Sequence, residues 1–213
     1  MRKLNLIGMV LFLAGSLSVS AQQALTTAEI STLKEKTAAS AKSLQSLESD
    51  FTQTKHLSYL DKAPQSSGKL YFKAPRKIRW EYTRPTSFTV VFNSDKMYTR
   101  DERGKTSQTD LATNRRFSAL NNLLTQTAQE GDFFDESQFS ITYAKNGDGY
   151  TAVLVPKEKA LGKYIKQIEL TIDPTSFLVK QVKIVDPSSD YTQLDFTDQR
   201  KNALVSEDKF VAK

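Results

Sequence analysis

Hydrophobic residues near the start of the chain recur at helical spacing. Thr26-Thr27-Ala28-Glu29 fits a capping box, with Thr26 as the N-cap and Glu29 at the third helical position. Apolar or compact residues then recur on one face, at Ile30, Leu33, Thr37, Leu44, Leu47 and Phe51. This spacing predicts an amphipathic helix of about six turns that ends near Phe51 and packs on the rest of the protein.

From Gly68 onward the period of the pattern changes to two. Apolar residues alternate with polar ones in three successive segments, Leu70 and Phe72, then Ile78, Trp80 and Tyr82, then Phe88, Val90 and Phe92. Turn residues at Ser94-Asp95 lead into a further strand at 96–99. Later strands are predicted at 139–143, 150–155, 164–172 and 177–185, with a last one through Leu194 and Phe196. The sequence Asn146-Gly147-Asp148-Gly149 is typical of a hairpin turn.

One internal stretch departs from this alternation. Phe117, Leu120, Leu123 and Leu124 fall on one face of a short predicted helix. The plan is therefore a helix, a run of strands, a helical insert and more strands. Strands that follow one another without alternating helices predict an antiparallel sheet that curls or closes, in a single domain.

The apolar side of the early strands leaves two interpretations open. Phe72, Trp80, Tyr82, Phe88 and Phe92 share one face. They form either a filled core under the helix or the wall of an unfilled apolar cavity, which would suit acyl chains. Periodicity does not separate a full core from a hollow one.

The opposite side of the same strands is basic. Lys69, Lys73, Lys77 and Arg79 project from it, and Arg76 and Arg84 lie in the flanking loops. Such a face is either simply solvated or a docking surface for an acidic partner or anionic head groups. Tyr71 is the one aromatic residue interleaved with these charges, which argues against a stacking platform for nucleic acid.

The first residues of the chain predict export. Arg2 and Lys3 precede an apolar stretch from Leu6 to Leu17, which is too short to span a bilayer comfortably. Compact residues then precede a cleavage point after Ala21, which is the three-part pattern of a secretory signal peptide. The sequence thus predicts a cleaved segment 1–21, a single mature domain at 22–213, and a soluble monomer in the periplasm.

Composition narrows the chemistry further. The chain of 213 residues has no cysteine and one histidine, His56, so disulfides, thiolate metal sites and multi-histidine sites are excluded. The formal net charge is +6, which favours membrane surfaces or acidic partners for an exported protein. No nucleophile elbow, Walker loop or zinc-protease motif occurs. We therefore predict no catalytic residue, no metal and no cofactor.

Several motifs, in order, resemble the periplasmic outer-membrane lipoprotein carrier family, LolA. The resemblance begins with 47–53, Leu-Glu-Ser-Asp-Phe-Thr-Gln, and continues through 68–75, Gly-Lys-Leu-Tyr-Phe-Lys-Ala-Pro. It is most specific at Ile78-Arg79-Trp80-Glu81-Tyr82 followed by Pro85, and includes 93–98. Phe196 and Phe210 fit the closing strands of the family. At Ala74 the sequence departs from the family, whose arginine there helps to latch a lid.

The resemblance implies a mainly β fold, an incomplete antiparallel β-barrel with helices covering an apolar cavity. It implies a carrier without enzymatic activity, which takes acylated lipoproteins from an ATP-driven inner-membrane complex and passes them to an outer-membrane acceptor. The alternatives are a periplasmic lipid-binding sensor or a carrier of another acylated lipid.

On this basis the expected site residues form three sets. The cavity walls are expected at Leu70, Phe72, Ile78, Trp80, Tyr82, Phe88, Val90 and Phe92. The lid is expected at Leu44, Leu47, Phe51, Phe117, Leu120 and Leu124. A weaker expectation places partner docking at Lys73, Arg76, Lys77, Arg79 and Arg84.

Overall fold

The computed structural model of the chain describes residues 23–93, 96–110, 134–147 and 149–211. In this part of the chain twelve strands form one sheet, accompanied by the helices α1 (Thr27–Lys42) and α3 (Lys159–Gly162) and the 3₁₀ helix η2 (Glu207–Phe210). The strands are β1 (Gln23–Ala24), β2 (Ser46–His56), β3 (Gln65–Lys73), β4 (Lys77–Arg84), β5 (Phe88–Asn93), β6 (Lys96–Arg100), β7 (Thr106–Asp110), β8 (Phe139–Asn146), β9 (Gly149–Pro156), β10 (Gln167–Ile172), β11 (Val179–Val185) and β12 (Tyr191–Lys201).

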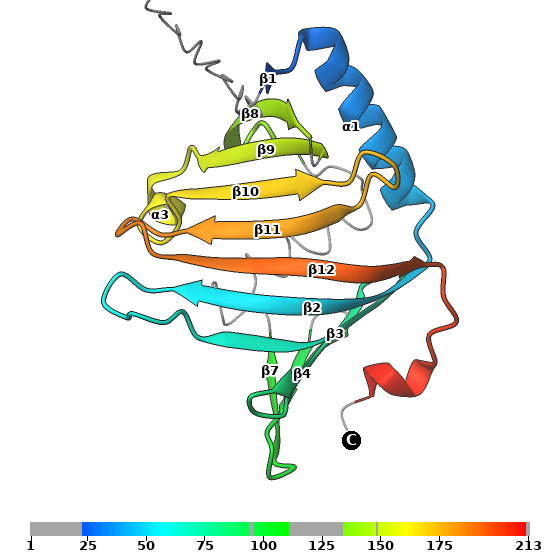
Figure 1. The fold of residues 1–213 in the computed structure, drawn as a ribbon. Helices are drawn as coiled ribbons and strands as arrows, with labels where there is room; N and C mark the ends of the chain where they lie inside the picture. The colour runs from blue at the N-terminus through cyan, green and yellow to red at the C-terminus, as the bar shows by residue number, and fades with distance from the viewer. Residues whose placement is uncertain (1–22, 94–95, 111–133, 148, 212–213) are drawn as a thin grey trace, which may run out of the picture.

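All neighbouring strands in the sheet are antiparallel, in the order β1-β8-β9-β10-β11-β12-β2-β3-β4-β5-β6-β7. The sheet is open and curls strongly, so that β4 and β7 run across the direction of β9–β12 in Figure 1. The predicted mainly β fold, a curved antiparallel sheet that curls without closing, is confirmed. The polar strand β7 and the two-residue strand β1 were not expected from the pattern.

The predicted N-terminal helix is correct in its start and wrong in its length. Thr26 caps α1, and its side chain and the Glu29 carboxylate complete the expected capping box. The helix ends at Lys42, however, and residues 46–56 form the long central strand β2. Leu47 and Phe51 therefore belong to the sheet, and Leu44 lies in the connection between the two elements.

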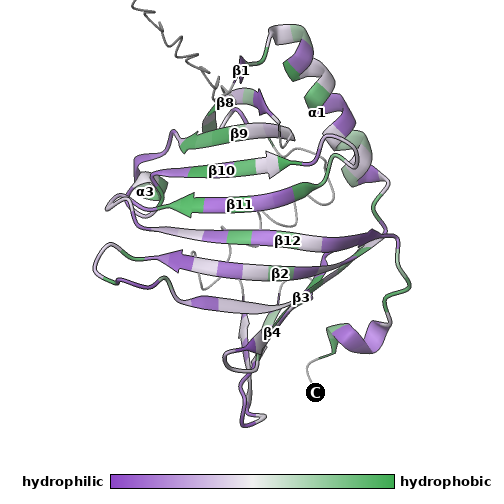
Figure 2. Ribbon diagram, in the orientation of Figure 1, coloured by the Kyte–Doolittle hydropathy of each residue, from purple (hydrophilic) through white to green (hydrophobic). Residues whose placement is uncertain are grey.

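Two faces of the sheet differ sharply in character. We call the face covered by α1 the inner face, and the opposite one the outer face. Along β10, Ile168, Leu170 and Ile172 are buried on the inner face and alternate with half-buried polar residues, an alternation visible as changes of colour along β10 and β11 in Figure 2. This alternation is the period of two that the sequence predicts.

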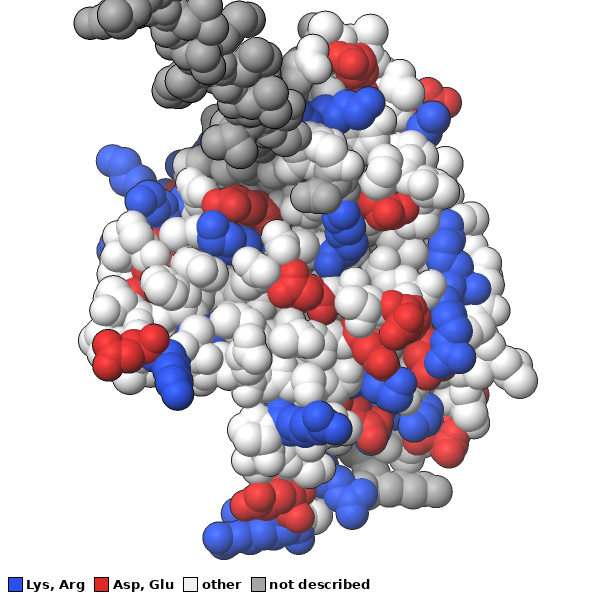
Figure 3. Space-filling model, in the orientation of Figure 1, with Lys and Arg blue, Asp and Glu red and all other residues white. Residues whose placement is uncertain are grey.

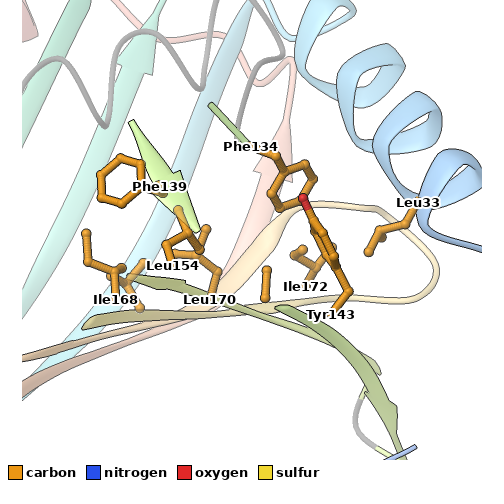
Figure 4. Packing of buried hydrophobic residues seen from close by; sticks show 10 residues of the cluster. Leu33, Phe134, Phe139, Tyr143, Leu154, Ile168, Leu170 and Ile172 are labelled. Carbon is orange, nitrogen blue, oxygen red and sulfur yellow. The ribbon is translucent and has the colours of Figure 1, made fainter. Parts of the chain in front are cut away.

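The inner face of β8–β11 carries the first buried cluster, shown in Figure 4. Leu33 from α1 points toward Leu170 and Ile172 on the sheet, and Tyr143 and Phe134 close the cluster at the β8 edge. Leu194 and Phe196 on β12 pack against this cluster and also against the second one, on β2–β6. The apolar inner face therefore runs without interruption from β8 to β6.

Asn202 joins three parts of the fold just after β12. Its side-chain oxygen accepts hydrogen bonds from the backbone N–H groups of Gln45 (2.8 Å) and Ser46 (3.4 Å), and its Nδ2 donates to the Ser43 carbonyl at 3.2 Å. Its φ of 56° lies in the left-handed region, which asparagine tolerates better than most residues. Asn202 thus fixes the α1–β2 connection to the end of the last strand.

We expect Asn202→Ala to destabilise the protein by about 2 kcal/mol, from lost hydrogen bonds and a left-handed alanine. Asn202→Gly, which keeps the backbone conformation, should lose only the hydrogen-bond part. Urea denaturation of the three proteins measures both contributions. Equal losses for the two variants would mean that backbone conformation contributes nothing here.

Candidate functional site

The eight predicted wall residues lie together on the inner face of β3–β5. Leu70 is opposite Trp80 and Phe72 is opposite Ile78 in the β3–β4 register. In the β4–β5 register, Phe92, Val90 and Phe88 lie opposite Ile78, Trp80 and Tyr82. A one-residue slip of either pair would turn these side chains to the other face, so the register alone brings them together.

Aromatic rings occupy the middle of this region. The Phe51 ring contacts the rings of Trp80 and Tyr82 edge-on, with both centroid distances at 5.0 Å. Trp80 also lies 6.0 Å from Phe196, and Tyr82 lies 6.5 Å from Phe88. Edge-to-face pairs of this kind add to the stability that burial provides. Phe51, expected in a lid, lies in β2, on the same face as the expected wall residues.

Burial falls from one end of this inner face to the other. Phe72, Ile78 and Phe92 are almost fully buried at the end where β2 begins, and Leu44 and Leu178 pack against them there. Leu70, Tyr82 and Val90 are half-buried. Phe88, at the opposite end, is 38% exposed. The region therefore has a closed apolar end and an open end.

A polar pair marks the approach to the open end. The Tyr82 hydroxyl donates a hydrogen bond to the Gln53 side-chain oxygen at 3.0 Å. Burial raises the pKa of Tyr82, so the phenol remains a donor throughout the physiological range. Gln53, in the segment that resembles the LolA family, thus offers a polar contact within an otherwise apolar surface.

A separate cavity of about 180 Å³ lies beneath the first half of α1. It is lined by Ala28, Glu29, Thr32, Leu33, Tyr150 and Phe177. Cavities of about 150 Å³ in other proteins hold a benzene-sized molecule, so this one is too small for a long acyl chain.

Three of the six expected lid residues lie in the described part of the chain, and two of these three are in the sheet itself. Leu44, Leu47 and Phe51 all belong to the second buried cluster, Leu47 and Phe51 as members of β2. Phe117, Leu120 and Leu124 lie outside the described residues. Met97 and Leu178 complete the cluster, although the sequence pattern did not single them out.

The expected basic docking face lies on the outer side of β3 and β4, and the chain's own C-terminal segment covers part of it. Lys73 and Lys77 pair with Glu207 of η2 at 2.9 and 2.7 Å. Arg79 pairs with Glu81 at 2.9 Å and donates to the Lys209 carbonyl. Phe210 is buried between these charges, against Tyr71 and Val91.

Two further arginines of the expected docking set lie at opposite ends of β4. Arg76 is in the β3–β4 turn, and Arg84 ends β4, where it is exposed to solvent. Phe210, expected in a closing strand, lies in η2 instead.

The ion pairs of Glu207 predict a pH dependence of stability. Hydrogen bonds from Lys77 and Lys73 lower the pKa of Glu207 below its ordinary value of 4.5. A carboxylate with a lowered pKa stabilises the fold above its unfolded pKa, and the effect is lost as the pH falls through the folded pKa. The wild type should therefore melt at a higher temperature than Glu207→Gln at pH 7, and the difference should shrink as the pH falls below 4.5 and the Glu207 carboxylate becomes protonated in the folded protein. Thermal melts from pH 7 to pH 3 test this, and a constant difference would contradict it.

Clusters of metal-ligating side chains and membrane-spanning helices are both absent from the described ranges. Nowhere in them do three His, Asp or Glu side chains converge to hold a metal ion. The helices in these ranges are also too short and too polar to cross a membrane.

Comparison with known proteins connects these features to one family. The family model described as "Outer membrane lipoprotein carrier protein LolA" matches residues 42–213. Its match begins at the end of α1 and includes all of β2–β12. No curated protein sequence matches the chain.

Solved structures of similar fold are distant in sequence. The MucA/MucB complex of Pseudomonas aeruginosa has 12% identity and a TM-score of 0.51, over 87% of this chain and 61% of that one. An uncharacterized conserved protein from Thermus thermophilus has 10% identity and a TM-score of 0.51, over 83% and 90%. A putative outer membrane lipoprotein-sorting protein domain from Vibrio parahaemolyticus has 9% identity and a TM-score of 0.46, over 84% and 94%. At such identities the two likenesses with a TM-score of 0.51 show the fold alone.

Proposed function

Because the chain belongs to the outer membrane lipoprotein carrier protein LolA family, we propose that it binds the acyl chains of lipoproteins. It takes them up as they leave the inner membrane and delivers them to the outer membrane. The observation that carries this proposal is the graded apolar inner face of β2–β6, closed and buried at one end and half-exposed at the other.

Transfer of an acyl chain through water without such a face would cost a large free energy. Each methylene group of an acyl chain gains about 0.8 kcal/mol when it leaves water. A carrier must supply this burial over the whole chain and still release it, which requires a closed state and an open state of different affinity. The packed end near Phe72 and Phe92 is closed here, so binding requires the side chains there to separate.

The gradient of burial also gives the ligand a direction. The chain ends fit the fully apolar region around Phe72, Ile78 and Phe92. The ester and amide groups near the lipid-modified terminus fit the open end, where the Gln53–Tyr82 pair offers hydrogen-bonding atoms. In this arrangement the protein part of the cargo remains outside.

The remaining assignments follow from the same proposal. The protein acts in the periplasm as a monomer after removal of residues 1–21, which lie outside the described residues, and 22–213 form one domain. Its family consists of carriers and binding proteins, and we propose no catalytic role. Its partners are acylated lipoproteins, an ATP-driven inner-membrane release complex and an outer-membrane acceptor.

A release assay tests this function directly. Purified mature protein is added to spheroplasts of the native cell type that carry labelled lipoproteins. We expect lipoproteins to leave the inner membrane as soluble one-to-one complexes, only when ATP is present. A fluorescent fatty acid measures the affinity of the inner face separately.

The two readouts separate the carrier from the alternatives. Binding of the fluorescent fatty acid without release of lipoproteins would overturn the lipoprotein role and favour a lipid sensor or a carrier of another acylated lipid. Absence of both would overturn acyl binding itself.

A further inference from the structure

Large apolar side chains that are exposed to solvent gather at one end of the sheet. Tyr59 is 76% exposed, Tyr164 57%, Val155 43%, Leu60 41% and Phe88 38%. Only Leu204 and Val211, near the C-terminus, are other exposed large apolar residues within the described ranges. Scattered single residues of this kind need no explanation, whereas a concentration at one end does.

The strand directions place all five side chains at this end. Tyr59 and Leu60 lie in the β2–β3 connection, Phe88 begins β5, Val155 is near the end of β9, and Tyr164 precedes β10. Because neighbouring strands are antiparallel, the ends of β2, β4, β9 and β11 meet the starts of β3, β5, β10 and β12 here. We call residues 55–64, 84–88, 155–166 and 186–190 the loop rim.

Hydrogen bonds join the segments of the loop rim to one another. The Ser58 N–H donates to the Asp190 carboxylate at 2.7 Å, which ties the β2–β3 connection to the β11–β12 turn. Lys166 donates through its backbone N–H to the Val185 carbonyl (2.8 Å) and through Nζ to the Ser189 hydroxyl (3.1 Å). Figure 1 shows these segments together with α3 at the left side of the molecule.

The loop rim also carries an excess of positive charge. It contains seven lysines and arginines and four aspartates and glutamates. This is a formal excess of three positive charges when His56 is neutral. Two of the acids, Asp186 and Asp190, accept backbone hydrogen bonds within and between the turns. The basic members are Lys55, Lys62, Arg84, Lys157, Lys159, Lys163 and Lys166.

On the outer face of the sheet, in contrast to the loop rim, the basic side chains form ion pairs with acids. On the outer face of β3 and β4, acids of η2 and neighbouring strands pair with the lysines. In Figure 3 blue and red side chains lie next to each other over much of the visible surface, and both colours also occur along the left edge. The connection before β8 lies beside the loop rim, where Lys157 donates to the Glu136 carbonyl, and it adds the acids Asp135 and Glu136 at this end of the sheet. The Glu136 carboxylate pairs with Lys34.

We propose that the loop rim docks on the surface of an anionic phospholipid bilayer. Lysines and arginines near such a surface are attracted to its negative potential. Tyrosine and other amphipathic or apolar side chains enter the head-group region, as they do at membrane interfaces. The loop rim combines both features, whereas acidic proteins would match only its charge.

The loop rim lies next to the open end of the inner face, which relates docking on a bilayer to acyl binding. Phe88 belongs both to the rim and to the open end of the inner face, and its ring lies 6.5 Å from that of Tyr82. A protein docked by its rim therefore turns the open end of the inner face toward the bilayer. This inference goes beyond the carrier function, which does not itself require contact with a bilayer surface.

Vesicle co-sedimentation of the mature protein tests the proposal. The vesicles are phosphatidylethanolamine with one quarter phosphatidylglycerol, compared with neutral phosphatidylcholine. We expect binding to the anionic vesicles, more than tenfold weaker binding to the neutral ones, and loss of binding at 0.5 M NaCl. No binding to anionic vesicles at low salt would overturn the proposal and leave the rim to a protein partner.

Rim variants and matched controls locate the contact. Lys62→Glu with Lys163→Glu should weaken binding more than tenfold, whereas Lys42→Glu with Lys96→Glu, the same charge change at the other end of the sheet, should change it less than threefold. Tyr59→Ser with Leu60→Ser should weaken binding at least fivefold, and Leu204→Ser should not. Equal losses in variants and controls would overturn the assignment to the rim.

One more variant separates this proposal from the carrier function. Val90→Asp, on the inner face, should lose binding of the fluorescent fatty acid and keep binding to vesicles. Rim variants should show the reverse. If Val90→Asp lost vesicle binding as well, the inner face and not the rim would be the membrane contact.

Discussion

Val90→Asp should abolish binding of a fluorescent fatty acid while the sheet remains folded. Val90 is half-buried on the inner face, opposite Trp80 on β4 and Thr99 on β6. An ionised carboxylate there remains hydrated in the free protein and must lose its water against an apolar ligand, which costs several kcal/mol. We expect the dissociation constant to rise at least about 100-fold, equivalent to roughly 2.7 kcal/mol.

The neighbouring residue supplies the matched control. Thr89 lies on the same strand, is half-buried, and points to the outer face, opposite Glu81 and Arg100. Thr89→Asp adds the same charge one residue away, so binding of the fatty acid should be unchanged. Circular dichroism and thermal melting establish that both variants fold. Unchanged binding in a folded Val90→Asp protein would exclude this face as the acyl site.

Gly68→Ala should be among the most destabilising single substitutions in the chain. A Cβ at Gly68 would lie 1.9 Å from the Glu81 carbonyl oxygen and 2.9 Å from the Tyr82 Cα. Both atoms are backbone atoms of β4, so relief requires β3 and β4 to separate beside the rings of Phe51 and Tyr82. Overpacking of this kind costs typically 1–3 kcal/mol and occasionally more. We expect about 3 kcal/mol, measured by urea denaturation.

Gly162 is the appropriate control for this measurement. It ends α3, and a Cβ there would meet no atom within 4 Å. Gly162→Ala should be neutral or stabilise the protein by up to about 1 kcal/mol, because alanine reduces the conformational freedom of the unfolded chain. A loss for Gly68→Ala no larger than the change for Gly162→Ala would show that the two strands adjust freely at this point.

The sequence pattern predicted which side chains of β3–β5 share the inner face, because large apolar residues occupy every second position of these strands. It failed at β2 for an identifiable reason. Ser49 is fully buried on the inner face between Leu47 and Phe51, where its single hydroxyl hydrogen is shared between the carbonyl oxygens of Asp50 and Thr197. A polar residue in the core conceals the alternation, and the remaining spacing of Leu44, Leu47 and Phe51 imitates a helix.

Two features could not be predicted from the sequence, each for its own reason: the packing of the C-terminal segment on the outer face of β3 and β4, and the loop rim. Val205 and Phe210 lie in a connection and a 3₁₀ helix, which have no apolar period, and their partners Tyr71 and Val91 are distant in sequence. The loop rim is assembled from four connections, none of which has a distinctive composition alone. Single-sequence patterns report elements, whereas these surfaces depend on how the elements meet.

The strand order also bears on the order of events during synthesis. β2 is central to the sheet and pairs along one side with β12, so that Phe51 lies opposite Phe196. Pairings between such distant segments form slowly, because the intervening chain must close a long loop first. Synthesis begins at the N-terminus and reaches β12 last. One edge of β2 therefore stays unpaired until almost all of the protein has been synthesised. For the export that we propose, the delay is an advantage, since a chain that has not finished folding can be threaded across a membrane without first being unfolded.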